Sequence, residues 1–132
     1  MLNLAMQDLH IRNSFPGFSR NIARSTGMWS GKIQPSDISC CYDVSIEYNL
    51  AKTPKVSVRW PTLHPRAPHL YPDGTLCLYW PKEWRWQGNE IIAETILPWT
   101  ALWLYYYELW LDTGYWLGPS AHGTNKMLSE HT

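Results

Sequence analysis

The sequence predicts an α+β fold, and three observations lead to that prediction. Residues 41–48 alternate strictly between apolar and polar side chains, as a half-buried strand does. Short turn-forming segments join this strand to two further β-like segments, and an apolar run long enough for a helix lies near the C-terminus. The expected order is an N-terminal helix, an antiparallel meander of three to four strands, a long loop and C-terminal helices.

Length and composition indicate one globular domain. A chain of 132 residues that is 45% hydrophobic and 17% charged fits a single domain with its own core. We therefore expect one domain over residues 1–132. Within it, residues 118–132 contain Gly, Pro, Ser and Asn and are expected to form a flexible tail.

Charge and hydropathy argue against two classes of partner. Lys and Arg number 11, as do Asp and Glu, so a formal net charge of zero gives no general attraction to nucleic acid. A membrane span needs about 20 mostly apolar residues. The most apolar stretch, residues 91–117, is interrupted by Glu94, Pro98, Glu108 and Asp112. We expect neither nucleic acid nor a membrane as a partner.

The first element is a short helix predicted over residues 2–12. Its apolar positions recur at helical spacing and form one expected side, made of Leu2, Ala5, Met6 and Leu9. Residues 13–17, Asn-Ser-Phe-Pro-Gly, then end the helix. Asp8 and His10 interrupt any long apolar core, so the segment is not expected to be a secretory signal.

Three strands are predicted next, over residues 28–34, 41–48 and 55–60. Turn residues at 35–37 and 52–54 separate them, and such short connections favour an antiparallel meander. One set of alternating side chains is expected to face the core. It comprises Trp29, Gly31, Ile33, Tyr42, Val44, Ile46, Tyr48, Val56, Val58 and Trp60.

A proline-rich segment and a helical region complete the chain. Five prolines in residues 61–90 prevent long regular structure and predict a long, ordered loop. Asn89 is the expected N-cap of a helix. Pro98 either breaks this helix or is the first residue of a second helix. Residues 99–112 are apolar on nearly every side, and Gly114 is expected to end the helix.

The three cysteines bear on compartment and chemistry. An odd thiol and an adjacent pair, Cys40 and Cys41, favour a reducing compartment, so we expect a cytoplasmic protein. Alternation at the start of the second strand places one of the pair inside and one outside, both in structural roles. No Cys-x-x-Cys or His-x-x-x-His pair occurs, so we expect no metal and no cofactor. Cys77, flanked by leucines, is by itself typical of a buried small hydrophobe.

The context of Cys77 changes that interpretation. Residues 74–78, Gly-Thr-Leu-Cys-Leu, have His69 upstream and Trp84 or Trp86 downstream. This pattern resembles the active-site segment of ubiquitin-conjugating enzymes, and the helix, meander and proline-rich approach before it are also similar. The resemblance implies the UBC-like fold for most of the chain.

A closer resemblance is to the divergent bacterial conjugating-enzyme-like proteins of cyclic-oligonucleotide antiphage (CBASS) operons. The matching segments are residues 69–79, the pair Pro98 and Trp99, and residues 110–118. The asparagine of the ubiquitin-conjugating motif is absent, because no Asn occurs between Asn49 and Asn89. The usual transfer to lysine then needs another supporting group.

The resemblance implies a cysteine-dependent acyl transferase. Cys77 would form a thioester, since a thiolate is a strong nucleophile and its thioester is reactive toward amines. His69 would orient the loop or act as a base.

Four further residues are candidates for supporting roles. Tyr71 and Asp73 could steer or deprotonate an attacking amine, and Gly74 would leave room for an incoming extended tail. His122 could fold over the site.

The resemblance also implies partners. The acyl group would come from the C-terminal carboxylate of a cGAS-like nucleotidyltransferase, or of another protein with a conjugatable C-terminus. A separate activating enzyme would prepare that carboxylate, and the chemistry would regulate antiphage defence. The expected partner-binding residues are aromatic: Trp84, Trp86, Trp103 and Tyr106.

Two alternatives remain open at this point. The chain could be a non-catalytic binding or scaffold module on the UBC-like fold, although inactive variants of that family have usually lost the cysteine. It could also be an unrelated small thiol hydrolase, which would need a base and an orienting carboxylate near Cys77.

Overall fold

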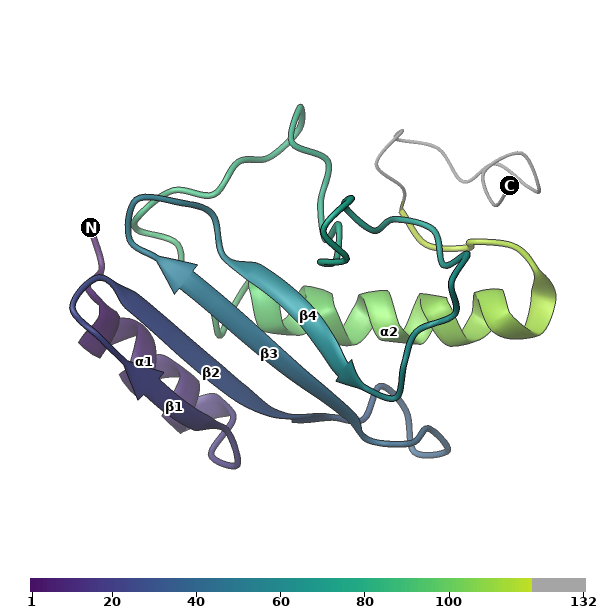
Figure 1. Ribbon diagram of the computed structural model, residues 1–132, viewed down its shortest axis with the longest axis horizontal. Helices are drawn as coiled ribbons and strands as arrows, with labels where there is room; N and C mark the ends of the chain where they lie inside the picture. Colours follow the sequence, from purple (N-terminus) through teal and green to yellow (C-terminus); the bar gives the residue numbers. More distant parts are fainter. Residues whose placement is uncertain (120–132) are drawn as a thin grey trace.

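The computed structural model describes residues 1–119 and shows an α+β fold (Figure 1). Its elements in chain order are α1 (Leu4–Ser14), β1 (Ser19–Ile22), β2 (Thr26–Ile33), β3 (Tyr42–Asn49), β4 (Lys55–Trp60) and α2 (Ile96–Thr113). The strands form one antiparallel sheet in the order β1-β2-β3-β4. The predicted helix–meander–loop–helix order, consistent with a UBC-like fold, is confirmed.

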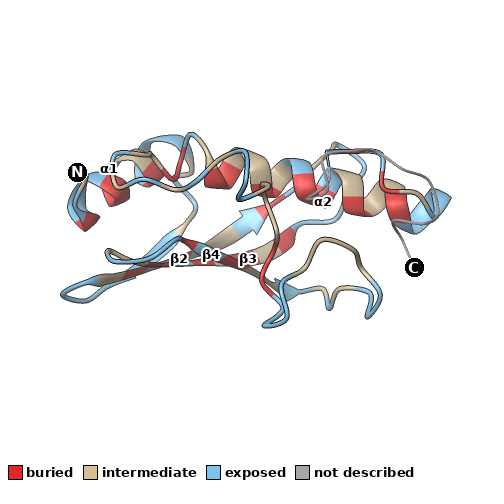
Figure 2. Cartoon of the chain, turned by 90° about the horizontal axis from the view of Figure 1, so that it is seen from above, coloured by how far each residue is buried: buried red, intermediate tan, exposed pale blue. Residues whose placement is uncertain are grey.

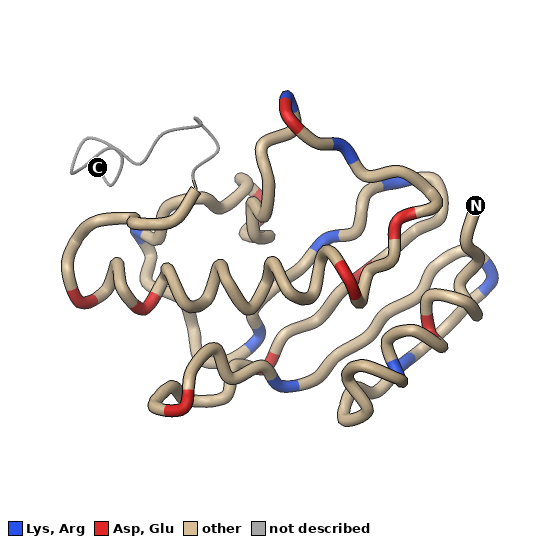
Figure 3. Tube along the Cα trace, turned by 180° about the vertical axis from the view of Figure 1, so that it is seen from behind, with Lys and Arg blue, Asp and Glu red and all other residues tan. Residues whose placement is uncertain are grey.

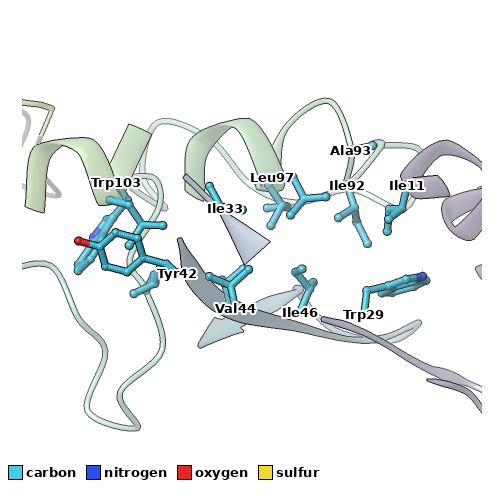
Figure 4. Close-up of a cluster of buried hydrophobic side chains, with 14 of the residues drawn as sticks. Ile11, Trp29, Ile33, Tyr42, Val44, Ile46, Ile92, Ala93, Leu97 and Trp103 are labelled. Atoms are coloured by element: carbon cyan, nitrogen blue, oxygen red, sulfur yellow. The ribbon is translucent and has the colours of Figure 1, made fainter. Parts of the chain in front are cut away.

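The molecule has two layers. Figure 2 shows α1 and α2 in one layer over a single face of the sheet. The core lies between these layers, and its best-shielded strand is β3. The four predicted inward side chains of β3 are at most 3% exposed: Tyr42, Val44, Ile46 and Tyr48. Figure 4 shows Val44 and Ile46 facing Leu97 and Ile92 across the core.

Two strand predictions were wrong. The prediction missed β1, since all four of its residues are exposed and no apolar alternation marks it. Trp60, expected inward, is 61% exposed. Asp43 pairs with Trp60 while Val44 pairs with Val58, so β4 carries one extra residue, Arg59, at a bulge. That residue moves Trp60 to the outer face of the sheet.

The predicted side of α1 was also wrong, although the helix forms. Met6 and Leu9 are about half exposed, and the buried residues of α1 are Leu4, Gln7, Asp8 and Ile11. The Asn3 side chain caps the helix by accepting a hydrogen bond from the Met6 N–H at 2.8 Å. The buried face of α1 therefore includes polar side chains, and a prediction from apolar spacing alone does not find it.

A single helix follows the long loop in the described residues, where two were expected. Asn89 is not an N-cap, because residues 92–95 form turns and α2 begins at Ile96 after Thr95. Pro98 lies in the first turn of α2, where backbone N–H groups have no partner within the helix. Gly114 ends α2 as predicted, with φ of 82° and its N–H donating to the Trp110 carbonyl.

Cys40 and Cys41 do not divide between inside and outside as expected. Both are exposed, because β3 begins only at Tyr42. The expected tail falls mostly on residues 120–132, which lie outside the described residues, as does His122. Gly118, at the start of that tail, is buried against the Tyr106 ring.

Buried polar side chains join α1 to the rest of the fold. Gln7 is fully buried, donates to the Glu90 carbonyl at 2.8 Å and accepts from the Ile92 N–H at 3.1 Å. Asp8 accepts a hydrogen bond from the Trp29 indole at 3.0 Å and pairs with Arg12 and Arg20. Gln7 thereby fixes the segment that leads into α2.

Hydrogen bonds also hold the C-terminal half of α2. Glu108 accepts from the Tyr42 hydroxyl at 2.7 Å and from the Ser39 hydroxyl at 2.6 Å. Burial, together with the Glu108 carboxylate, raises the pKa of Tyr42, so this phenol stays a donor. The Tyr107 hydroxyl accepts from the His64 N–H at 2.8 Å, which ties the long loop to the same helix.

Replacing Gln7 by Met tests the polar link between α1 and the approach to α2. Met has a similar size but leaves the Glu90 carbonyl and the Ile92 N–H without their partner. We expect the free energy of unfolding to fall by about 1–3 kcal/mol, measured by urea denaturation. The matched control Gln87→Met changes an exposed residue and should stay within about 0.5 kcal/mol of the wild type. Equal effects of the two changes would contradict this role of Gln7.

Candidate functional site

Cys77 lies on a small hairpin whose strands are held by backbone hydrogen bonds. Leu70 and Leu76 form an antiparallel bridge, and the Cys77 N–H donates to the His69 carbonyl at 2.9 Å. The Tyr71 N–H donates to the Thr75 carbonyl at 2.9 Å. The hairpin is anchored to the sheet, because the Leu76 N–H donates to the Val56 carbonyl of β4 at 2.9 Å. This pairing fixes the backbone of the cysteine.

Gly74 closes the turn of this hairpin. Its φ is +87°, which favours glycine, and its N–H donates to the Tyr71 carbonyl at 2.8 Å. The position of an added Cβ has no heavy atom within 4 Å. The local reason for glycine here is therefore backbone conformation, while the space around it is open.

The Cys77 side chain is partly exposed and borders a groove of about 330 Å³. Its Sγ donates to the Tyr79 carbonyl at 3.5 Å. The other wall of the groove is a stripe on α2 made of Trp99, Leu102, Trp103 and Tyr106. Since Cys77 is partly exposed and lines this groove, the residue is not sealed in the core.

His69 contacts Cys77 through its backbone. It adopts the left-handed conformation, with φ of 58°, which is uncommon for a residue other than glycine. Its carbonyl accepts from the Cys77 N–H and from the Trp103 indole at 3.2 Å. Its ring packs edge-on against Trp116, with centroids 4.8 Å apart. This geometry supports the orienting role among the two expected for His69.

Tyr71 and Asp73 occupy the turn but differ in their chemistry. Burial, followed by hydrogen bonding with the Cys77 thiol, raises the pKa of Tyr71, which keeps its hydroxyl protonated at neutral pH. Asp73 accepts from the Thr75 hydroxyl at 2.6 Å and from the Thr75 N–H at 3.0 Å, and it pairs with Lys55 at 3.2 Å. These contacts lower the pKa of Asp73 to about 2. A carboxylate of such low basicity is suited to fixing the turn and poorly suited to deprotonating an amine.

The expected partner-binding aromatics divide between two grooves. Trp84, Trp103 and Tyr106 line the groove of Cys77, although Trp103 is only 4% exposed, and Trp84 also borders the second groove. Trp84 packs between Tyr79 and Trp99, with ring centroids 4.7 and 4.8 Å away.

Trp86 lies elsewhere. It packs against Tyr48, donates to that hydroxyl at 3.3 Å and lines a second groove of about 830 Å³. Lys52, Lys55 and Arg85 lie along this second groove, as do Tyr71 and Asp73.

Sequence reasoning did not assign several lining residues of the Cys77 groove to the site, among them Trp80, Leu102 and Trp116. A signal for the α2 wall was present, because residues 99, 102, 103 and 106 follow the i, i+3, i+4, i+7 spacing of one helix face. Nearly every other position of this helix is also apolar, which hid the stripe. Trp116 lies in the segment 110–118 that already resembled the CBASS group.

Other kinds of site find less support within residues 1–119. Acidic and basic residues are spread along the trace with no extended run of one sign (Figure 3). No group of three His, Cys, Asp or Glu side chains in that range could hold a metal ion. No helix there is both long and apolar enough to cross a membrane.

The pKa of Asp73 gives a test of the turn. It lies below the ordinary value of 3.8, so ionised Asp73 stabilises the turn above that pH, and the contribution is lost as the pH falls toward about 2. We expect Thr75→Val to raise the Asp73 pKa more than Lys55→Met does, because the Thr75 hydroxyl is the larger cause. Carboxyl carbon NMR titration measures both shifts, and a larger shift in Lys55→Met would contradict this order.

Comparison with known proteins agrees with the fold. No curated protein matches the chain. The family model for Type II CBASS E2 protein matches residues 7–123, a range that holds the whole sheet, the Cys77 hairpin and α2. The chain therefore belongs to the family of Type II CBASS E2 proteins.

Proposed function

We propose that this protein is a ubiquitin-conjugating-like transferase that carries an acyl group as a thioester on Cys77. The acyl group is the C-terminus of a partner protein, and the transferase passes it to an amine. The reaction takes place in the bacterial cytoplasm, where a reducing environment keeps the thiol free, and it regulates CBASS antiphage defence.

The observation that carries this proposal is the position of Cys77. The residue is partly exposed at the wall of a groove, and its backbone N–H is held by the His69 carbonyl. Acyl transfer requires the reacting carbonyl carbon to reach the sulfur along a defined path. A cysteine held in a fixed position beside an open groove provides such a path.

The lining of the groove favours an extended polypeptide as its occupant. Its walls are mostly aromatic and aliphatic, and Glu83 is its one charged lining residue within the described chain. A C-terminal tail without bulky charges would bury apolar surface there while its last carbonyl reaches Cys77. Aromatic rings such as Trp84 and Trp99 offer rigid contact surface at low entropic cost.

The two steps of the reaction balance without a cofactor. The Cys77 thiolate attacks the carbonyl carbon of an activated C-terminus, the C–S bond forms, and the activating group leaves. An amine then attacks the thioester, the C–N bond forms, and Cys77 departs as a thiolate while the amine loses a proton. The activated C-terminus comes from a separate activating enzyme.

The partner that we propose is a cGAS-like nucleotidyltransferase of the same CBASS system. Support comes from the family, because an E2 protein of type II CBASS works with other CBASS proteins. A flexible C-terminus on that nucleotidyltransferase would supply the carboxylate that the groove receives.

The first test is intact mass spectrometry of the protein co-expressed with the other proteins of its CBASS operon. We expect an adduct between Cys77 and a protein C-terminus that hydroxylamine cleaves, as it does thioesters. Cys77→Ala should abolish the adduct, and Cys41→Ala, which removes an exposed thiol elsewhere, should retain it. Persistence of the adduct in Cys77→Ala would contradict the proposal.

A pair of leucines on α2 tests the groove. Leu102 lines the groove and is 51% exposed, while Leu111 lies two turns later and is 50% exposed. We expect Leu102→Arg to slow adduct formation at least tenfold, because a charge would have to be buried against the incoming tail. Leu111→Arg should change it less than twofold.

The variants Cys77→Ala and Leu102→Arg also distinguish an acyl transferase from a non-catalytic binding module. Phage protection that survives Cys77→Ala but is lost in Leu102→Arg would favour the non-catalytic binding module. Equal rates of adduct formation in Leu102→Arg and Leu111→Arg would contradict the assigned path of the tail.

A further inference from the structure

The reaction proposed for Cys77 needs a group that stabilises negative charge on the transferring carbonyl, and this inference rests on that proposed function. When a thiolate or an amine adds to the carbonyl carbon, its oxygen becomes an oxyanion. A hydrogen-bond donor already held beside that oxygen is worth about 10²–10³ in rate in comparable sites. Such a donor must lie close to the Cys77 sulfur.

The hairpin brings Tyr71 to the same face as Cys77. Leu70 is paired with Leu76, and the hydrogen bonds of Tyr71 to Thr75 and of Cys77 to His69 flank that pair. Side chains alternate along each strand, so Tyr71 and Cys77 lie on the opposite side from Leu76, which is buried in the core. Such diagonal neighbours have Cα atoms about 7–8 Å apart, within reach of a tyrosine side chain.

The Tyr71 hydroxyl stays protonated at neutral pH. Hydrogen bonding with this thiol is the second cause, after burial, that raises the pKa of Tyr71. A phenol whose pKa is raised remains a donor and does not act as a base at neutral pH.

The polar groups that bond to Cys77 or lie in its turn are less suited to this role. The Tyr79 carbonyl, which accepts from the Cys77 sulfur, is only an acceptor. The Cys77 N–H is already used by the His69 carbonyl. The ionised carboxylate of Asp73 would repel an oxyanion, and it is held by Thr75 and Lys55.

We infer that Tyr71 is a further catalytic residue, whose hydroxyl donates a hydrogen bond to the oxyanion on the carbonyl that is bound to the Cys77 sulfur. In the first step the carbonyl π pair moves to oxygen as the C–S bond forms, and it returns as the activating group leaves. In the second step it moves again as the amine adds, and it returns as the C–S bond breaks. Tyr71 keeps its proton throughout, so no external acid or base is required for this role.

The backbone around Tyr71 gives it the fixed position that such a donor needs. The Tyr71 N–H and carbonyl are both bonded within the turn, to Thr75 and Gly74. Asp73 stabilises the same turn through Thr75 and Lys55. The hydroxyl is thus held close to its working place before the acyl group arrives, which lowers the reorganisation needed during reaction.

The test compares two reactions of the same sulfur in the variant Tyr71→Phe. The first is acylation of Cys77 by a small thioester of N-acetylglycine under single-turnover conditions, followed by intact mass spectrometry. The second is alkylation by iodoacetamide at a pH of about 9.5, above the ordinary thiol pKa of about 8.5, a reaction that forms no oxyanion. The matched control is Tyr105→Phe, which alters a tyrosine of similar exposure on α2.

We expect Tyr71→Phe to slow acylation by about 10²–10³-fold and to change alkylation less than twofold. Tyr105→Phe should leave both rates unchanged. Equal slowing of both reactions in Tyr71→Phe would mean that Tyr71 affects the reactivity of the thiol and not the oxyanion, and it would overturn the inference. An unchanged acylation rate would overturn it as well. Failure of the wild type to accept any acyl group while it is readily alkylated would instead contradict the proposed function.

Discussion

The hydrogen bond from the Cys77 N–H to the His69 carbonyl is the constraint on which the site depends. It pairs the two arms of a hairpin, and the next residue back, Leu76, joins that hairpin to β4 through the Val56 carbonyl. A loop rich in proline would otherwise leave the cysteine without a defined direction. Through these backbone hydrogen bonds, the antiparallel sheet fixes where Cys77 lies relative to the groove.

The helix α2 completes the site from the opposite side. Its Trp103 donates to the same His69 carbonyl, so helix and hairpin meet at one oxygen atom. Hydrogen bonds from Tyr42 and Ser39 to Glu108 hold the far half of the helix. The aromatic stripe that forms the second wall of the groove is thereby set at a fixed separation from Cys77. The many aromatic residues of the sequence therefore form this wall of the groove as well as part of the core.

Much of the fold could be predicted where the signal is local. The period-two pattern of β3 and the left-handed Gly114 were both readable from neighbouring residues. The errors have non-local causes: Gln7 and Asp8 are buried because their partners lie far along the chain, and a bulge turned Trp60 outward. At the site, the residues around Cys77 were singled out by their resemblance to a known motif, but the hairpin that carries Cys77 was not predicted, because the prolines indicated only a long loop. The positive φ of His69, which makes its carbonyl the contact with Cys77, has no sequence signal in a residue other than glycine.

The most direct measurement of the central claim is an experimental structure of the protein with a peptide C-terminus attached to Cys77 through a stable amide, made by replacing the cysteine with diaminopropionate. The account predicts that the peptide runs extended between the Cys77 hairpin and the α2 stripe at Leu102 and Tyr106, with its carbonyl oxygen facing Tyr71. A peptide that leaves the attachment point along the second groove, past Trp86 and Arg85, would contradict it.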